Sequence, residues 1–213
     1  MNTGNTSAES HLGSVLLKGK QAAFMVVLES RNFVHSVEHA IRVRDMAVQL
    51  AREEGLHDRT AILALELAAY WHDTGRNDWQ IETACHAQAS VKKFRVWAQL
   101  ESISEDLASQ VESIIVSHRK GRDPVSTDVL SSLFWDADKL DIFNVPRTQQ
   151  LLDLYMLGVR SPAYDRTSSL QYWSEFSSEF RERFKTAAGK RNFEDRFPEF
   201  CHMIAELVVG KRK

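Results

Sequence analysis

The stretch LALELAAYWHD, from Leu63 to Asp73, decides how the rest of the chain is interpreted. Its apolar residues predict a buried helix, and at the end of that helix His72 and Asp73 stand side by side. Burying either polar side chain is costly unless the side chain is paired or coordinates a metal. The pair therefore requires partners from elsewhere in the chain.

Three other polar side chains lie on the apolar faces of predicted helices. His39 begins one apolar stripe, His118 ends a second, and Asp138 continues a third, each at helical spacing. With His72 and Asp73 they supply imidazoles and carboxylates, which are ligand types that bind divalent metals. Since a bound cation offsets the cost of burying carboxylates, the sequence predicts a divalent-metal site.

Asp136 and Asp138 lie in the same segment, DADKLD, but helical geometry separates them. Their side chains lie about 200° apart around a helix of roughly 3.6 residues per turn. Asp138 continues the line of Leu130 and Phe134 and is expected to face the core. Asp136 is expected to face elsewhere, either at the surface or behind a ligand.

Length and composition bound the class of protein. The 213 residues suffice for one domain with a sizeable core, and 43% hydrophobic and 26% charged residues are typical of a soluble globular protein. The net charge of −2 gives no indication of general nucleic-acid or membrane-surface binding. No apolar run approaches the roughly 20 residues of a membrane span. With only Cys85 and Cys201, we expect a reduced, cytoplasmic protein.

Long stretches with little proline or glycine predict an all-α fold and a single domain over residues 11–213. Residues 1–10 are expected to form a flexible tail and not a signal peptide. Asp58 and Ser102 are expected N-caps, and Gly55 and Gly121 are expected helix ends. The predicted helices cover residues 12–29, 36–54, 59–72, 82–100, 104–119, 126–142, 146–158, 167–188 and 194–209.

Three segments, in this order, resemble the HD-domain metal-dependent phosphohydrolase superfamily. They are EHAIRV from Glu38, WHDTGR from Trp71 and DADKLD from Asp136. The resemblance covers about residues 33–142 and rests on the ordered set of histidine, histidine-aspartate and aspartate. It implies an all-helical HD-type core, to which the C-terminal helices at about residues 146–209 would be an addition.

The resemblance also implies a set of metal ligands. One divalent ion (Mn, Fe, Mg, Co or Ni) would be bound by His39, His72, Asp73 and Asp138. Branches of the superfamily with two metals place further histidines between the motifs, and in this chain those are His86 and His118. Asp73 would then bridge the two ions. The alternative for His86 is a position at the surface or behind a ligand.

His35 and Arg76 are further candidates for catalysis. His35 precedes His39 by four residues, a spacing similar to that of cyclic-nucleotide phosphodiesterases, in which the earlier histidine protonates the leaving oxygen. The alternative is a histidine in solvent at a helix start. Arg76 falls where many family members carry a cation after the HD pair, and it could hold a phosphate oxygen. The alternative is a solvated loop arginine, and Arg42 and Lys139 are weaker candidates for the same task.

These features together predict hydrolysis of a nucleotide-like or other small phosphate ester, by a protein that could form a homo-oligomer. Acidic residues shortly after the HD pair, present in the deoxynucleotidases and guanosine-tetraphosphate hydrolases of the superfamily, are missing from Thr74-Gly75-Arg76-Asn77, so those two substrates are not favoured. Two other functions stay open. One is a di-iron oxygenase with the same ligands, and the other is a sensor that binds a nucleotide without turnover.

Overall fold

The computed structural model describes residues 4–30, 35–76, 85–119, 128–149 and 181–209. Within these ranges the chain is helical and contains no strand, which confirms the predicted all-α fold. None of the described helices is both long enough and apolar enough to cross a membrane. The helices are α1 (Gly4–Ser30), α2 (Val37–Glu53), α3 (Arg59–Trp71), α4 (His86–Leu100), α5 (Glu105–Ser117), α6 (Val129–Leu140) and α9 (Ala187–Val209), with 3-10 turns η1 (Asp141–Phe143) and η2 (Arg181–Arg183).

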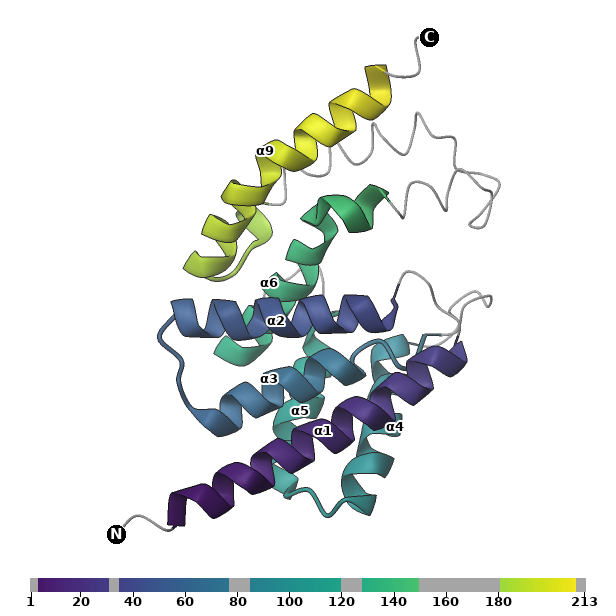
Figure 1. The fold of residues 1–213 in the computed structure, drawn as a ribbon, viewed down its shortest axis with the longest axis vertical. Coiled ribbons are helices and arrows are strands. Elements are labelled where there is room, and N and C mark those ends of the chain that lie inside the picture. The colour runs from purple at the N-terminus through teal and green to yellow at the C-terminus, as the bar shows by residue number, and fades with distance from the viewer. Residues whose placement is uncertain (1–3, 31–34, 77–84, 120–127, 150–180, 210–213) are drawn as a thin grey trace.

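Helix α3 is the central element of the fold. It packs against α1, α2, α4, α5 and α6, while α9 lies against α6 at the other end of the molecule (Figure 1). Every residue from Leu67 to Trp71 is buried, as expected for a helix that is apolar on all sides. The end of this helix, where the HD pair follows, therefore lies inside the bundle.

Local capping sets several of these helix boundaries. The Asp58 carboxylate accepts a hydrogen bond from the Ala61 N–H at 2.7 Å, and Gly55 ends α2 with a φ of 77°, as both were predicted to do. The expected cap at Ser102 is wrong. Ser104 caps α5 instead, because Ser102 adopts a φ of 55° in the turn that precedes it. Gly121 lies outside the described residues.

Both ends of the chain differ from the predicted helices. The helix α1 begins at Gly4, inside the segment expected to be a tail, because no proline interrupts it. Residues 145–149 are helical, as expected for the helix predicted from 146, but the remainder of that helix and most of 167–188 lie outside the described residues. The predicted helical end at 188 is wrong, because residues 184–186 are not helical and α9 begins at Ala187.

Asp136 anchors the residues directly before α9, which begins at Ala187. Its carboxylate accepts hydrogen bonds from the N–H of Lys185 at 2.9 Å, the N–H of Thr186 at 2.8 Å and the hydroxyl of Thr186 at 2.7 Å. A Cβ at Gly189 would collide with the same carboxylate. Asp136 does point away from Asp138. Of the two positions expected for it, the surface is wrong, because the side chain is fully buried against Thr186 and Gly189.

We expect Asp136→Ala to lower the free energy of unfolding by roughly 2–4 kcal/mol, because two backbone N–H groups and a hydroxyl lose their buried acceptor. Urea denaturation measures this loss. The matched control is Asp58→Ala, which removes a more exposed cap and is expected to cost about 1 kcal/mol. Losses of equal, small size in the two variants would contradict the anchoring of α9 by Asp136.

Candidate metal centre

Six ligand-type side chains meet where the ends of five helices converge. Each is at most 9% exposed, and each comes from the first or last turn of its helix or from the residue beside it. His39 lies in the first turn of α2, His72 and Asp73 follow α3, His86 begins α4, His118 follows α5, and Asp138 lies in the last turn of α6. The structure thus brings together every metal ligand expected from the sequence.

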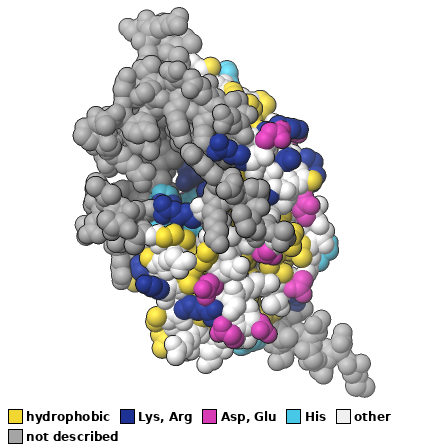
Figure 2. All heavy atoms as spheres, turned by 180° about the vertical axis from the view of Figure 1, so that it is seen from behind, with side chains coloured by type: hydrophobic (Ala, Val, Ile, Leu, Met, Phe, Trp, Pro, Cys, Tyr) yellow, Lys and Arg dark blue, Asp and Glu magenta, His cyan; other side chains and the backbone are white. Residues whose placement is uncertain are grey.

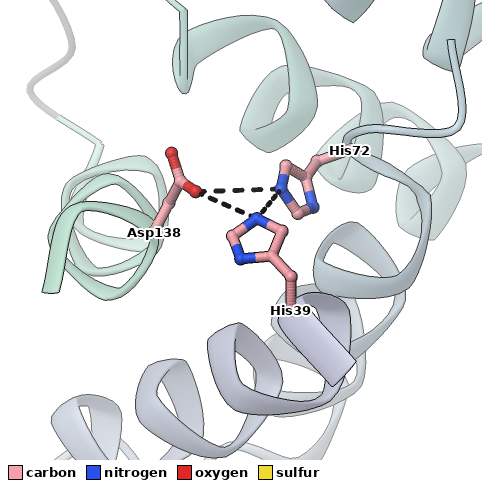
Figure 3. Close-up of side chains that lie close together, drawn as sticks. All are labelled: His39, His72 and Asp138. Carbon is pink, nitrogen blue, oxygen red and sulfur yellow. Dashed lines mark hydrogen bonds and ion pairs between the residues drawn. The ribbon is translucent and has the colours of Figure 1, made fainter. Parts of the chain in front are cut away.

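The first cluster comprises His39, His72 and Asp138, whose ligand atoms all lie within 4.8 Å of one another. The Nε2 atoms of His39 and His72 are 3.2 Å apart. Oδ1 of Asp138 lies 3.5 Å from the His39 nitrogen and 3.8 Å from the His72 nitrogen. Figure 3 shows these three groups pointing toward one another from three different helices. Two imidazole nitrogens and a carboxylate oxygen around one point are a donor set that fits a divalent transition metal.

The second cluster comprises Asp73, His86 and His118, again with all ligand atoms within 4.8 Å. The Nε2 atoms of the two histidines are 3.1 Å apart. Oδ1 of Asp73 lies 3.4 Å from Nε2 of His86 and 3.8 Å from Nε2 of His118. The second cluster therefore has the same composition as the first.

Asp73 belongs to both clusters. While Oδ1 faces the second cluster, Oδ2 lies 3.2 Å from Nε2 of His72 and 3.6 Å from Nε2 of His39. One carboxylate thus offers one oxygen to each side. This is the geometry that a bridging ligand between two cations requires.

The ends of α3 and α5 orient two of the histidines in the same way. Nδ1 of His72 donates to the carbonyl of Ala69 at 2.8 Å, and Nδ1 of His118 donates to the carbonyl of Ile115 at 2.5 Å. Carbonyls in the last turn of a helix have no partner within the helix, so these bonds satisfy them. The same bonds place the ring proton on Nδ1 and leave the Nε2 lone pair facing the cluster.

His39 is oriented by a carboxylate that sequence reasoning missed. Its Nδ1 lies 2.6 Å from Oδ2 of Asp141, whose carboxylate also accepts from Nε of Arg42 at 2.7 Å. Asp141 stands three residues after Asp138, so it shares a helix face with a predicted ligand, and this spacing was the available signal. An imidazole held by a carboxylate is a common support of a metal ligand.

His86 is held differently from the other three histidines. Its Nδ1 lies 2.9 Å from Nη1 of Arg119. A guanidinium can only donate, so this nitrogen accepts and the ring proton sits on Nε2, directed at Nε2 of His118. A metal bound through Nε2 of His86 requires the opposite tautomer. The first cluster therefore fits a cation as it stands, and the second fits one after the contact with Arg119 is broken.

Ser90 joins the turn after His72 and Asp73 to helix α4. The hydroxyl of Ser90 donates to the carbonyl of His72 at 2.6 Å and accepts from the N–H of Gly75 at 2.8 Å. A Cβ at Gly75 would collide with the backbone of α4 at His86 and Ser90. The turn after the HD pair therefore lies directly on the helix that carries His86.

The carboxylates of the centre are ionised despite their burial. Burial alone would raise the pKa of Asp138, but Lys139, 2.6 Å from Oδ2, and the nearby imidazoles hold it well below its usual value. The pKa of Asp73 is likewise lowered, against burial, by His72, His35 and Arg76. Deprotonated carboxylates are the form that binds metals.

The imidazole of His118 is neutral. Burial lowers its pKa to about 3, and the neighbouring His72 acts in the same direction. A neutral ring is the form of histidine that binds metals. His118 thus offers its donor nitrogen, beside ionised carboxylates, in the protonation state that a cation requires.

His35 and Arg76 both lie beside Asp73. His35 precedes α2, whose N-cap is Ser36, so it lies in the turn before the helix that carries His39. Its Nε2 nevertheless lies 3.8 Å from Oδ2 of Asp73, and burial holds its pKa well below the usual value. Nε of Arg76 donates to Oδ1 of Asp73 at 2.7 Å, so this arginine is held at the centre.

Comparison with solved structures identifies the fold of the chain. No protein-family model and no curated protein matches the chain. Solved structures do match. One is a predicted HD superfamily hydrolase from an uncultured Thermotogales bacterium, with 19% identity over 94% of this chain and 92% of the other and a TM-score of 0.60.

Two further solved structures match the chain over most of its length. YpgQ of Bacillus subtilis, solved in complex with ADP, has 19% identity over 89% of this chain and 95% of its own, with a TM-score of 0.62. A structural-genomics target from Lactobacillus plantarum has 18% identity over 92% and 96%, with a TM-score of 0.65. The chain therefore has the fold of the HD superfamily hydrolases, as the resemblance of its motifs predicted.

Proposed function

We propose that this protein is a metal-dependent phosphohydrolase that acts on a nucleotide-like or other small phosphate ester. The observation that carries the proposal is the pair of buried histidine-aspartate clusters that share Asp73. The ADP complex of YpgQ, a protein of the same fold, supports a nucleotide-like substrate. Two neighbouring cation sites are suited to a displacement at phosphorus, since they can stabilise both the attacking and the leaving oxygen.

In this proposal His39, His72, Asp73 and Asp138 hold the first ion, and Asp73, His86 and His118 hold a second. A bound divalent ion supplies the Lewis acidity that activates water and polarises a phosphoryl oxygen. Asp141 keeps the proton of His39 on Nδ1, and the carbonyls at the ends of α3 and α5 do the same for His72 and His118. The ligand nitrogens are thereby aimed at the cations before they bind.

Two other side chains act on the substrate. Arg76 is held beside Asp73 through Nε, so its positive charge lies at the centre, where it can offset charge on a phosphate. His35, near Oδ2 of Asp73, delivers a proton to the leaving oxygen. Burial is the largest cause of its lowered pKa, and the negative charge of a bound phosphate ester would raise that pKa, so the ring would take its proton from solvent when the substrate binds.

A turnover screen tests the function. Purified protein is assayed against phosphomonoesters, phosphodiesters and nucleotides with Mn²⁺, Mg²⁺, Co²⁺, Ni²⁺ and Fe²⁺ in turn, with and without oxygen. We expect release of phosphate or a nucleoside monophosphate that requires a metal and is independent of oxygen. Oxygen-dependent turnover with iron would instead identify an oxygenase. Nucleotide binding without turnover under every condition would identify a sensor.

The two aspartates of α6 provide a matched test of the metal site. We expect Asp138→Asn to abolish activity and lower metal occupancy, because it removes a ligand of the first cluster. Asp136→Asn should lower the unfolding free energy but leave the folded protein with its metal, since its carboxylate faces Thr186. Metal analysis by mass spectrometry and thermal unfolding with added Mn²⁺ measure the two effects. Metal loss in the Asp136 variant alone would refute the ligand assignment.

The two ions should bind with unequal affinity. Arg119 opposes the tautomer that His86 needs to bind a metal through Nε2. The two histidines of the first cluster already have the required tautomer, with the ring proton on Nδ1. Calorimetric titration with Mn²⁺ should therefore show a tight and a weaker site. Arg119→Gln, whose amide oxygen can accept the Nδ1 proton, should tighten the weaker site by roughly tenfold. Arg119→Lys, which can only donate, should not. Two equal sites in the wild type would contradict this.

We expect His35→Ala to retain metal and to lose about 10²–10⁴-fold in rate, the range typical of a lost general acid. The loss should be largest for esters with poor leaving groups, which depend most on protonation. Rates for a series of aryl phosphates of different leaving-group pKa measure this, with metal content as the control. Equal losses across the series would rule out proton donation, and a loss of metal would make His35 a ligand.

A further inference from the structure

Several lysine and arginine side chains surround the metal centre, and most of them form hydrogen bonds with its carboxylates or imidazoles. On the face in Figure 2, opposite to that of Figure 1, Lys or Arg side chains gather beside histidine. The engaged pairs are Arg42 Nε with Asp141 at 2.7 Å, Arg76 Nε with Asp73 at 2.7 Å, Lys139 Nζ with Asp138 at 2.6 Å, and Arg119 Nη1 with His86 at 2.9 Å. Three of these groups contact the expected ligands themselves, and Arg42 contacts Asp141, which supports His39.

Arg147 is the exception. Its side chain is only 8% exposed, and its Nε lies 3.0 Å from Oδ2 of Asp141. The N–H is not directed at that oxygen, and Nε has no hydrogen-bond acceptor among the residues that the structure describes. Buried polar groups almost always have a partner, so a buried guanidinium with an unused donor requires an explanation.

The local charge does not balance around Asp141. Its one carboxylate faces two guanidinium groups, those of Arg42 and Arg147, in addition to the N–H of His39. Arg42 has its charge and its hydrogen bonds satisfied by this carboxylate and is one-third exposed to solvent. The charge of Arg147 is buried and in excess. Burying a charge is costly unless an opposite charge compensates it.

Arg147 lies close to the candidate metal centre, because the Asp141 carboxylate that it faces also holds His39. It belongs to the helical residues 145–149 that follow η1, directly after the segment that supplies Asp138 and Asp141. Its charge also reaches His35, whose pKa it helps to lower, although burial is the largest cause. An anion that approaches His35 and the metal ligands therefore approaches this guanidinium as well.

We propose that Arg147 binds a phosphate group of the substrate through its guanidinium. The planar fork of an arginine matches two oxygens of a phosphate, and a phosphate would supply both the missing acceptor and the missing negative charge. Asp141 orients the fork from behind, as it does the ring of His39. The inference rests on the proposed function and adds a specificity-determining residue to it.

Binding of inorganic phosphate to the Mn²⁺-loaded protein tests this, measured by calorimetry for wild type, Arg147→Gln and Arg42→Gln. We expect phosphate to bind Arg147→Gln roughly 10- to 100-fold more weakly, the loss typical of a hydrogen bond to a charged group. Arg42→Gln, which removes the other arginine at Asp141, should bind phosphate like the wild type. Mn²⁺ affinity should be the same in all three proteins.

The outcomes separate this inference from the proposed function. If wild type and Arg147→Gln bind phosphate equally, the inference fails and the phosphohydrolase stands. If both variants weaken phosphate and Mn²⁺ alike, Arg147 acts only through Asp141 and the inference fails. If wild type binds Mn²⁺ but no phosphate, both proposals fail. Should Arg147→Gln not fold, Arg147→Lys keeps the charge, and phosphate affinity equal to the wild type there would overturn the two-oxygen contact.

Discussion

The rest of the centre depends on one ionised carboxylate that is buried among imidazoles. Asp73 is 8% exposed and lies within 3.8 Å of the Nε2 atoms of His39, His72, His86 and His118. An isolated carboxylate in this position would be neutralised by protonation. The surrounding histidines and Arg76 keep it charged, and in turn it holds them together from helices far apart in sequence. A cation on either side strengthens the same arrangement.

The fold places its ligands where helices end, and this has a physical reason. The final turn of a helix presents carbonyls without partners, and a histidine at the cap can satisfy one of them with its own ring. His72 and His118 both do so, at three residues' separation. The backbone therefore fixes the tautomer of each ring without help from another side chain. Only His39, at the start of α2, needs a carboxylate from elsewhere for this purpose.

The sequence predicted the fold class and the grouping of the ligands. Helical periodicity showed that His39, His118 and Asp138 face inward, and the resemblance to the HD family added His86. It could not predict partners that depend on long-range packing. Asp141 supports His39 across 102 residues of chain. Its spacing from Asp138 indicated the same helix face, but that spacing did not show which side chain Asp141 would contact. Asp136 was predicted to face away from Asp138, and it does, but the sequence did not show that α9 would cover it. His35 reached the centre through the turn before α2 and not along a helix face.

The close packing at Gly75 limits which residues can occupy that position. The turn that it forms lies against the backbone of α4 with no space for a Cβ, and Ser90 fastens the two together. The separation of the turn and α4 is thus fixed by main-chain contact between neighbouring segments, before any ligand side chain is considered. Any larger residue at position 75 would force the turn and the backbone of α4 apart, because its Cβ would collide with α4 at His86 and Ser90. A residue with no side chain thereby acts as the spacer between the turn and α4.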